Sequence, residues 1–358
     1  MFCGTRTRSF SSWLLILVLV VSLCDAGLYS QQPTATYSVK VKVVNMLATV
    51  RDKHGQIIRS LTKDDFTLEE DGRPQTIRYF TRETDMPLTL GLLVDTSRSQ
   101  LRLLDEERTA SHSFLDQMLR ENKDNAFLIH FDSQVELLQD ATGSRQKLEQ
   151  ALADVNMSRE EQPVSGSPGS WPGGGGHRHG GGGGSSAAAG TLLYDAVFLA
   201  SDELMKKEQG RKALIILSDG MDQGSKLSLE TAIAAAQRAD TMVYSILFAD
   251  PQFYNQGPFG GWGGHRGGWG RFPQEDHPNG KKIMEKLATD TGGRFFEVGK
   301  KQSIEQIYAQ IQEELRNQYS IGYTPDRPNP GSGYHKLHLA AKQKDMIVQT
   351  RDGYYWDR

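Results

Sequence analysis

The chain has 358 residues, of which 37% are hydrophobic and 24% charged, so it is long enough to bury the core of one large or two moderate domains. Its formal net charge is −3, with 41 Lys and Arg against 44 Asp and Glu, which argues against a basic surface for nucleic acid. Its two cysteines are Cys3 and Cys24, so the rest of the chain has no disulfide framework and no cysteine-based zinc site.

Residues 1–26 have the pattern of a secretory signal. Arg6 and Arg8 precede a short apolar run, and small residues follow up to Ala26. The run is shorter than the roughly 20 residues of a membrane-spanning helix. We expect cleavage near Ala26 and a secreted or periplasmic protein that meets a membrane only through this segment. The alternatives are a retained anchor helix and a lipidated Cys24.

A small β module is expected over residues 37–84. From 37 to 43 apolar and polar residues alternate, as they do in a half-buried strand, with Val43 on the apolar face. Turn-forming residues stand at 52–55 and 70–73, and a strand pattern follows.

From Pro87 onwards the pattern changes to apolar runs without alternation, which is typical of strands buried on both faces of a sheet. These runs lie at 88–94, 126–131, 213–217 and 242–248. Helical spacing of apolar residues appears at 114–119, 193–204, 229–236, 283–287 and 304–315, with Ser228 and Ser303 as predicted N-caps. Alternating strands and helices predict an α/β domain with a doubly wound, mostly parallel sheet over residues 87–318.

After Gln318 the chain returns to short β segments, at 319–323, 335–339 and 346–350. Neither end has enough strands to cover an apolar face, because isolated hairpins are marginal in water. We therefore expect residues 319–358 to pair with 37–84 in one β-sandwich-like module. Two separate flaps packed on the α/β domain are the alternative.

Two glycine-rich inserts, at 163–190 and 251–280, interrupt the α/β part and hold more than half of the 37 glycines. Glycine at this density loses too much backbone entropy on ordering to form helix or strand interiors, so we expect loops. The inserts also contain Trp171, Trp262 and Trp269.

Three loops carry side chains that suit a hard metal ion. Asp95, Ser97 and Ser99 follow the first buried run, Thr191 opens a helix, and Asp219 follows a later buried run. In an open α/β sheet, ligands bind beyond the carboxyl ends of the strands. Carboxylate and hydroxyl oxygens are the donors that Mg²⁺ prefers.

At these five positions the chain resembles the von Willebrand factor A (VWFA) domain family with its metal-ion-dependent adhesion site, which implies a VWFA/Rossmann-like fold. Apart from the glycine-rich inserts, nearly the whole chain is similar to the bacterial VWFA-related proteins typical of Acidobacteria. Segments 44–52, 61–66 and 70–72 resemble their leader module, and 321–325 and 352–355 resemble their tail.

The resemblance implies that Ser97, Ser99 and Thr191 contact an Mg²⁺ ion, or Mn²⁺ or Ca²⁺, directly or nearly so. Asp95 and Asp219 then act mainly through water, and a Glu or Asp of a partner protein completes the shell. Few direct carboxylates leave such an ion electron-poor, which favours an acidic ligand. The alternative is a degenerate domain in which Asp95 and Thr191 only cap helices.

The function expected from this resemblance is metal-dependent binding of a partner protein outside the cytoplasm. Arg98, Trp171, Trp262 and Trp269 are the expected ligand contacts, because we expect both inserts to overhang the metal face and the β module to lie on the opposite side. A structural component of the cell envelope that does not use the ion is the alternative. No enzyme is expected, because the chain lacks a Gly-x-Ser-x-Gly elbow, a phosphate-loop ending and, once the signal is removed, a cysteine nucleophile.

Three further polar residues have simpler interpretations. His130 lies within a buried run and is expected to be a hydrogen-bonded core histidine. Asp195 is expected to be a carboxylate in the first turn of a helix, where the helix dipole favours it, and otherwise an outer ligand of the metal. Asp222 is expected to be a solvated loop residue.

Overall fold

The computed structural model describes residues 43–83, 85–97, 99–100, 103–120, 122–157, 190–248, 280–299, 302–326 and 331–356. The expected signal segment, Arg98, the three tryptophans of the inserts and most of the expected strand at 37–43 lie outside these residues. In the part of the chain that is described, no helix combines the length and the apolar character needed to cross a membrane.

A six-stranded sheet forms the centre of the α/β part, in the order β10-β9-β8-β5-β6-β7. Its strands are β5 (Leu88–Asp95), β6 (Asn125–Phe131), β7 (Val135–Thr142), β8 (Arg211–Ser218), β9 (Met242–Leu247) and β10 (Phe295–Glu297). All neighbours are parallel except β7, which runs antiparallel to β6. The predicted doubly wound, mostly parallel sheet is confirmed, and the four predicted runs are its four central strands.

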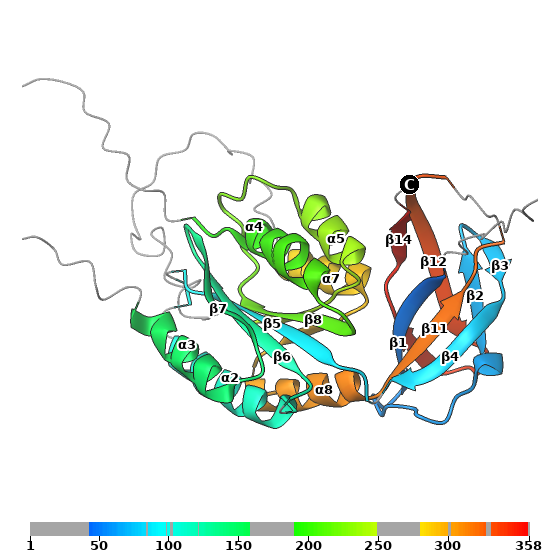
Figure 1. Ribbon diagram of the computed structural model, residues 1–358, viewed down its shortest axis with the longest axis horizontal. Helices are drawn as coiled ribbons and strands as arrows, with labels where there is room; N and C mark the ends of the chain where they lie inside the picture. The colour runs from blue at the N-terminus through cyan, green and yellow to red at the C-terminus, as the bar shows by residue number, and fades with distance from the viewer. Residues whose placement is uncertain are drawn as a thin grey trace, which may run out of the picture. The chain divides into compact units, whose positions relative to one another are not determined.

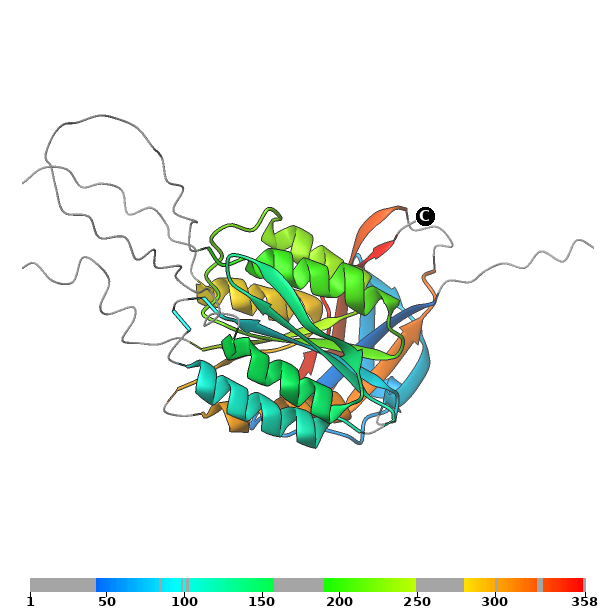
Figure 2. The same ribbon diagram turned by 60° about the vertical axis from the view of Figure 1, so that its left-hand side comes forward.

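Helices cover both faces of this sheet (Figures 1 and 2). They are α2 (Leu104–Met118), α3 (Arg145–Met157), α4 (Leu193–Phe198) with its continuation η3 (Leu199–Leu204) and η4 (Met205–Lys207), α5 (Leu229–Arg238), α7 (Gly280–Thr291) and α8 (Ile304–Arg316). One apolar core joins α2, α3 and α8 to the sheet, and a second joins α4, α5 and α7 to its other face. The two predicted N-caps are confirmed, because Ser228 accepts from the Thr231 amide and Ser303 forms a capping box with Gln306.

Gly280 corrects one expectation about the inserts. The sequence places it at the end of a loop, whereas it is buried and begins α7. A Cβ atom added at Gly280 would overlap the carbonyl oxygen of Asp219. Glycine is therefore required here for the close approach of α7 to the loop after β8, not for loop flexibility.

The β module consists of two four-stranded antiparallel sheets, in the orders β13-β1-β11-β4 and β14-β12-β2-β3. Its strands are β1 (Val44–Asp52), β2 (Phe66–Glu70), β3 (Arg73–Gln75), β4 (Ile77–Glu83), β11 (Gln318–Tyr323), β12 (Gly333–Ala341), β13 (Met346–Gln349) and β14 (Gly353–Trp356), with a short 3₁₀ turn η2 (Lys63–Asp65) before β2. β1 lies between β11 and β13, and β2 lies between β12 and β3, so each sheet combines strands from both ends of the chain. The predicted sandwich-like module is confirmed, and the two-flap alternative is wrong.

Two details of the predicted leader differ in outcome. Val43 directly precedes β1, which begins at Val44, and the rest of the expected strand at 37–43 lies outside the described residues. The predicted turn at 70–73 is confirmed, because Asp71 and Gly72 have φ angles of 49° and 75°. Positive φ at both central residues is what a tight hairpin between β2 and β3 requires.

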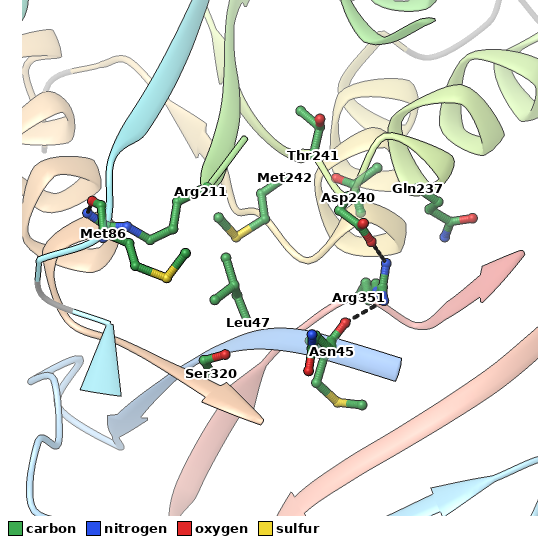
Figure 3. A pocket seen from close by; sticks show the side chains of 13 residues that line it. Asn45, Leu47, Met86, Arg211, Gln237, Asp240, Thr241, Met242, Ser320 and Arg351 are labelled. Carbon is green, nitrogen blue, oxygen red and sulfur yellow. Dashed lines mark hydrogen bonds and ion pairs between the residues drawn. The ribbon is translucent and has the colours of Figure 1, made fainter. Parts of the chain in front are cut away.

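The β module contacts the α/β part at the amino ends of the parallel strands, and residues 42–358 form one compact unit. Arg211, at the start of β8, donates to the carbonyl oxygens of Met86 and Leu315. A cavity of about 220 Å³ lies beside these contacts, lined by Leu47 of β1, Met242 of β9 and eleven other residues (Figure 3). The module is therefore on the side away from Asp95, as expected.

Removing the chain after Gln318 is expected to expose the leader segment. β1 would lose both of its neighbours and β2 would lose β12, so the apolar side chains of β1 would have nothing to pack against. We expect residues 43–83 to become sensitive to limited proteolysis, read by mass spectrometry, while the far-ultraviolet helical signal of the α/β part remains. A leader that stayed protected would contradict the shared core.

Candidate metal centre

Two of the three predicted loops meet because their strands are neighbours. Asp95 is the last residue of β5, and Asp219 follows β8 directly. β5 and β8 pair in parallel, with Val94 opposite Leu217. The carboxyl ends of the two strands therefore bring the Asp95 and Asp219 loops together at one edge of the sheet.

Asp95 joins these two loops through its side chain. It is fully buried, with 0% of its surface exposed. Its Oδ1 accepts a hydrogen bond from the Ser97 amide at 2.9 Å, and its Oδ2 accepts from Ser218 Oγ at 2.6 Å. Burial and the nearby charge of Asp219 raise the pKa of Asp95 to about 7.

The two serine hydroxyls continue the link to Asp219. Ser97 Oγ and Ser99 Oγ are 3.1 Å apart, within hydrogen-bond distance. Ser99 Oγ donates to Asp219 Oδ2 at 2.7 Å, and Asp219 Oδ1 accepts from the Met221 amide at 3.0 Å. Four of the five predicted residues are thus connected by hydrogen bonds across two loops.

Thr191, the fifth predicted residue, is buried in the loop before α4. Its carbonyl oxygen accepts from the Gln223 amide at 2.9 Å, and the next amide, of Leu192, donates to the Asp132 carbonyl at 2.9 Å. The backbone around Thr191 is therefore held to the loops after β8 and after β6.

Two further carboxylates, Asp195 and Asp222, hydrogen-bond to the segments around the start of α4 and the loop after β8. Asp195 lies in the first turn of α4, as predicted, and accepts from the amides of Lys226 and Leu227. Asp222 is half-buried and accepts from Ser225 Oγ at 2.6 Å and from the Tyr194 amide at 3.2 Å. The expectation of a solvated Asp222 is wrong, because this residue holds the loop after β8 against the start of α4.

The donor chemistry of this edge fits a divalent cation. Asp95 and Asp219 supply carboxylate oxygens, and Ser97, Ser99 and Thr191 supply hydroxyl oxygens, which are the hard donors preferred by Mg²⁺ and Mn²⁺. Burial, and after it repulsion from the charge of Asp219, raise the pKa of Asp95. A divalent ion would remove this repulsion.

Other titratable groups have structural explanations. His130 Nδ1 lies 3.2 Å from Thr96 Oγ1 and its Nε2 lies 3.1 Å from Glu136 Oε2, so the predicted hydrogen-bonded core histidine is confirmed. A second group of possible ligands comprises His112 and Asp116 on α2 and Glu149 on α3. These side chains are partly exposed, and each ring nitrogen of His112 already faces a carboxylate, so ion pairing accounts for the group.

Sequence analysis missed two buried polar residues behind the first loop, Gln100 and Glu107. The helical spacing of α2 could have indicated that Glu107 is buried. Glu107 falls at the helical interval between the apolar residues Leu104 and Phe114, on the stripe of α2 that faces the core. A charged residue on such a stripe is unusual.

No family model and no curated protein matches the chain. Several solved structures are similar to it. An aerotolerance-related membrane protein from Bacteroides fragilis is 15% identical, over 64% of this chain and 98% of that one, with a TM-score of 0.42. A von Willebrand factor type A protein from Catenulispora acidiphila is 11% identical, over 81% and 72%, with a TM-score of 0.42. Proximal thread matrix protein 1 from the mussel byssus, with a zinc-occupied MIDAS motif, is 12% identical, over 68% and 50%, with a TM-score of 0.40.

Solved structures similar to this chain thus include von Willebrand factor A domains. At these identities and TM-scores the likenesses carry no argument about function, and the fold assignment stands on the strand order and pairing of the chain itself. No comparison bears on the narrower similarity to proteins of Acidobacteria, which stays a prediction.

Proposed function

We propose that the α/β part is a VWFA-type domain that binds a partner protein through a divalent cation held at the edge formed by β5 and β8. The observation that carries this proposal is the continuous set of hydrogen bonds that runs from the Asp95 carboxylate through the Ser97 amide and the Ser97 and Ser99 hydroxyls to the Asp219 carboxylate. A set that only capped helices would not need buried carboxylates from two different strands beside one another.

The hydroxyl-bearing and carboxylate-bearing residues would have different roles. The hydroxyls of Ser97, Ser99 and Thr191 are neutral donors, so they leave most of the positive charge on the ion. Asp95 and Asp219 balance that charge from behind. Asp219 orients the Ser99 hydroxyl, and Asp95 holds the Ser97 backbone through its amide. The cation, when bound, supplies a Lewis-acidic position that a carboxylate of the partner can occupy.

The expected ligand contacts and location belong to this proposal. Two described residues support this: Gly190, the last residue of the first insert, directly precedes Thr191, and Gly280, the last residue of the second, lies against the Asp219 carbonyl oxygen. We propose that Arg98 and the tryptophans of the inserts surround the ion and touch the partner. A secreted or periplasmic location follows from the signal pattern at residues 1–26.

Titration with Mn²⁺ tests the proposal without knowledge of the partner. We expect calorimetry to show one saturable Mn²⁺ site per chain, and Ser99→Ala to weaken it at least tenfold because a ligand and its bond to Asp219 are lost. Ser133→Ala, which changes an exposed serine beside Asp132, is the matched control and is expected to bind like the parent. Absence of a saturable site, or a Ser99→Ala variant with unchanged affinity, would favour the envelope component that does not use the ion.

A further inference from the structure

Gln100 and Glu107 lie inside the protein without the hydrogen bonds that buried polar groups normally make. Gln100 is 0% exposed and Glu107 is 1% exposed. Neither the amide atoms of Gln100 nor the two carboxylate oxygens of Glu107 have a hydrogen-bond partner among the described residues. An unsatisfied buried polar group destabilises the fold, and a charged one does so more strongly, so their presence needs a reason.

The backbone places both residues on the side of the metal loop. The Gln100 amide donates to the carbonyl oxygen of Ser97, the Leu103 amide donates to that of Gln100, and the Glu107 amide donates to that of Leu103. These bonds follow one another at one-turn intervals from the metal loop into α2. Residues separated in this way share one side of a helical path, so Gln100, which directly follows Ser99, and Glu107 lie on the same side.

Among the described residues, the two charged groups that act on Glu107 are both acidic. Burial, the charge of Asp95 and the charge of Glu106 each raise the pKa of Glu107 well above its usual range. From α8, the helix packed against α2, the facing group is Tyr308, whose hydroxyl lies 2.8 Å from Ser111 Oγ and which is uncharged at neutral pH. Asp219 acts electrostatically on Asp95, and Asp95 acts on Glu107, so these three buried acidic side chains are linked by mutual repulsion.

We propose that Glu107 is a positioning residue of the metal centre, which strengthens cation binding through its negative charge when the ion is bound, and that Gln100, on the same side of the helical path, then supplies an amide donor to its carboxylate. This inference rests on the proposed function. A third carboxylate behind the ion adds charge to the site without occupying a coordination position. The centre therefore holds its cation before the partner's carboxylate arrives and depends less on that carboxylate than the five-residue motif alone would.

The Glu107→Gln variant is therefore expected to keep its thermal stability in EDTA but to bind Mn²⁺ more weakly. In EDTA the variant is expected to be at least as resistant to heat as the parent, because an unpaired buried acid becomes a neutral amide of the same shape. Its affinity for Mn²⁺ is expected to fall roughly tenfold, the lower end of the effect of losing a residue that supports metal ligands. A purely structural Glu107 would leave the affinity unchanged.

The experiment compares Mn²⁺ binding, measured by calorimetry, with melting in EDTA for the whole protein. Ser201→Ala is the matched control, because Ser201 in η3 is also buried with an unpartnered side-chain oxygen but packs with α4 on the other sheet face. It is expected to melt no lower than the parent and to bind Mn²⁺ normally. Gln100→Leu is the second variant, with an expected loss of affinity of about threefold, should Glu107→Gln fold poorly.

Each outcome is decisive. Wild-type affinity in both Glu107→Gln and Gln100→Leu overturns the inference while the loss in Ser99→Ala keeps the proposed function. No Mn²⁺ binding by the parent protein overturns both. Weakened binding in the Glu107 variant, with unchanged binding in Ser201→Ala, supports the inference.

Discussion

In EDTA at pH 8, replacing Asp95 by asparagine is expected to raise the free energy of unfolding by about 2 kcal/mol. Asp95 is fully buried and faces Asp219, which together raise its pKa to about 7 from an ordinary value of 3.8. About three pKa units correspond to roughly 4 kcal/mol of differential stability. Asparagine recovers part of this cost, because it removes the charge but disturbs the hydrogen bond from Ser218.

The pH dependence of this effect follows from the direction of the shift. Because the pKa is higher in the folded state, the folded protein binds the proton more tightly than the unfolded chain. The Asp95 contribution is therefore most favourable below pH 3.8, is lost as the pH rises towards about 7, and is constant above it. The advantage of the Asp95→Asn variant is expected at pH 8 and should shrink strongly at pH 4.5.

Urea unfolding at the two pH values measures this difference. Asp140→Asn, at an exposed carboxylate on β7, is the control and is expected to change stability by less than about 0.5 kcal/mol. Saturating Mn²⁺ is expected to reverse the order of the parent and the Asp95→Asn variant, since the parent alone gains binding energy from the ion. A variant that was less stable than the parent at pH 8 in EDTA would show that Asp95 is not a source of strain.

The strands that could be predicted from the sequence are those buried on both faces, because such strands are composed mainly of apolar residues. β5 and β8 are buried along their whole length, so their apolar runs are visible without any partner. β7 is an edge strand whose residues are half exposed and whose register against β6 is irregular, so it has neither a clean run nor a clean alternation. α3 was missed although its buried apolar residues Leu148, Ala151, Leu152 and Val155 keep regular helical spacing.

The candidate site was likewise predicted only in part from the sequence. Asp95, Ser97 and Ser99 form a local motif, and the rule that ligands lie at carboxyl ends of parallel strands adds Asp219. The bond from Ser218 to Asp95 joins residues 123 positions apart, and no local pattern predicts it. Glu107 was missed because an acidic residue in a helix is usually exposed, and its burial depends on how α2 packs against the sheet and α8.

Long-range pairing also joins the β module to the α/β part. Glu314 on α8 has 1% of its side chain exposed, and its Oε1 accepts from Arg51 Nη1 of β1 and from Arg294 Nη1, each at 2.6 Å. Arg51 also donates to Gln349 of β13 at 2.7 Å. One carboxylate thus neutralises two guanidinium groups from different parts of the molecule, 263 and 20 residues away.

Glu314→Ala is therefore expected to lower the free energy of unfolding by about 3–5 kcal/mol, because removing one member of a buried charge cluster leaves the others uncompensated. Glu313→Ala, on the same helix, is the matched control, since its pair with Arg59 is more than half exposed on both sides, at 55% and 53%. It is expected to cost less than about 1 kcal/mol.

The strands that lose stability in Glu314→Ala show whether Glu314 mainly holds the β module to the α/β part or stabilises the whole protein. Arg51 belongs to β1, which pairs with β11, and β11 directly follows α8, so the loss of Glu314 is expected to loosen the β module first. In native-state hydrogen exchange, amides of β1 and β11 should lose protection in Glu314→Ala while those of β5 and β8 keep theirs. Equal loss in all four strands would mean that the two parts unfold as one cooperative unit, with Glu314 contributing to its stability as a whole and not to the joint.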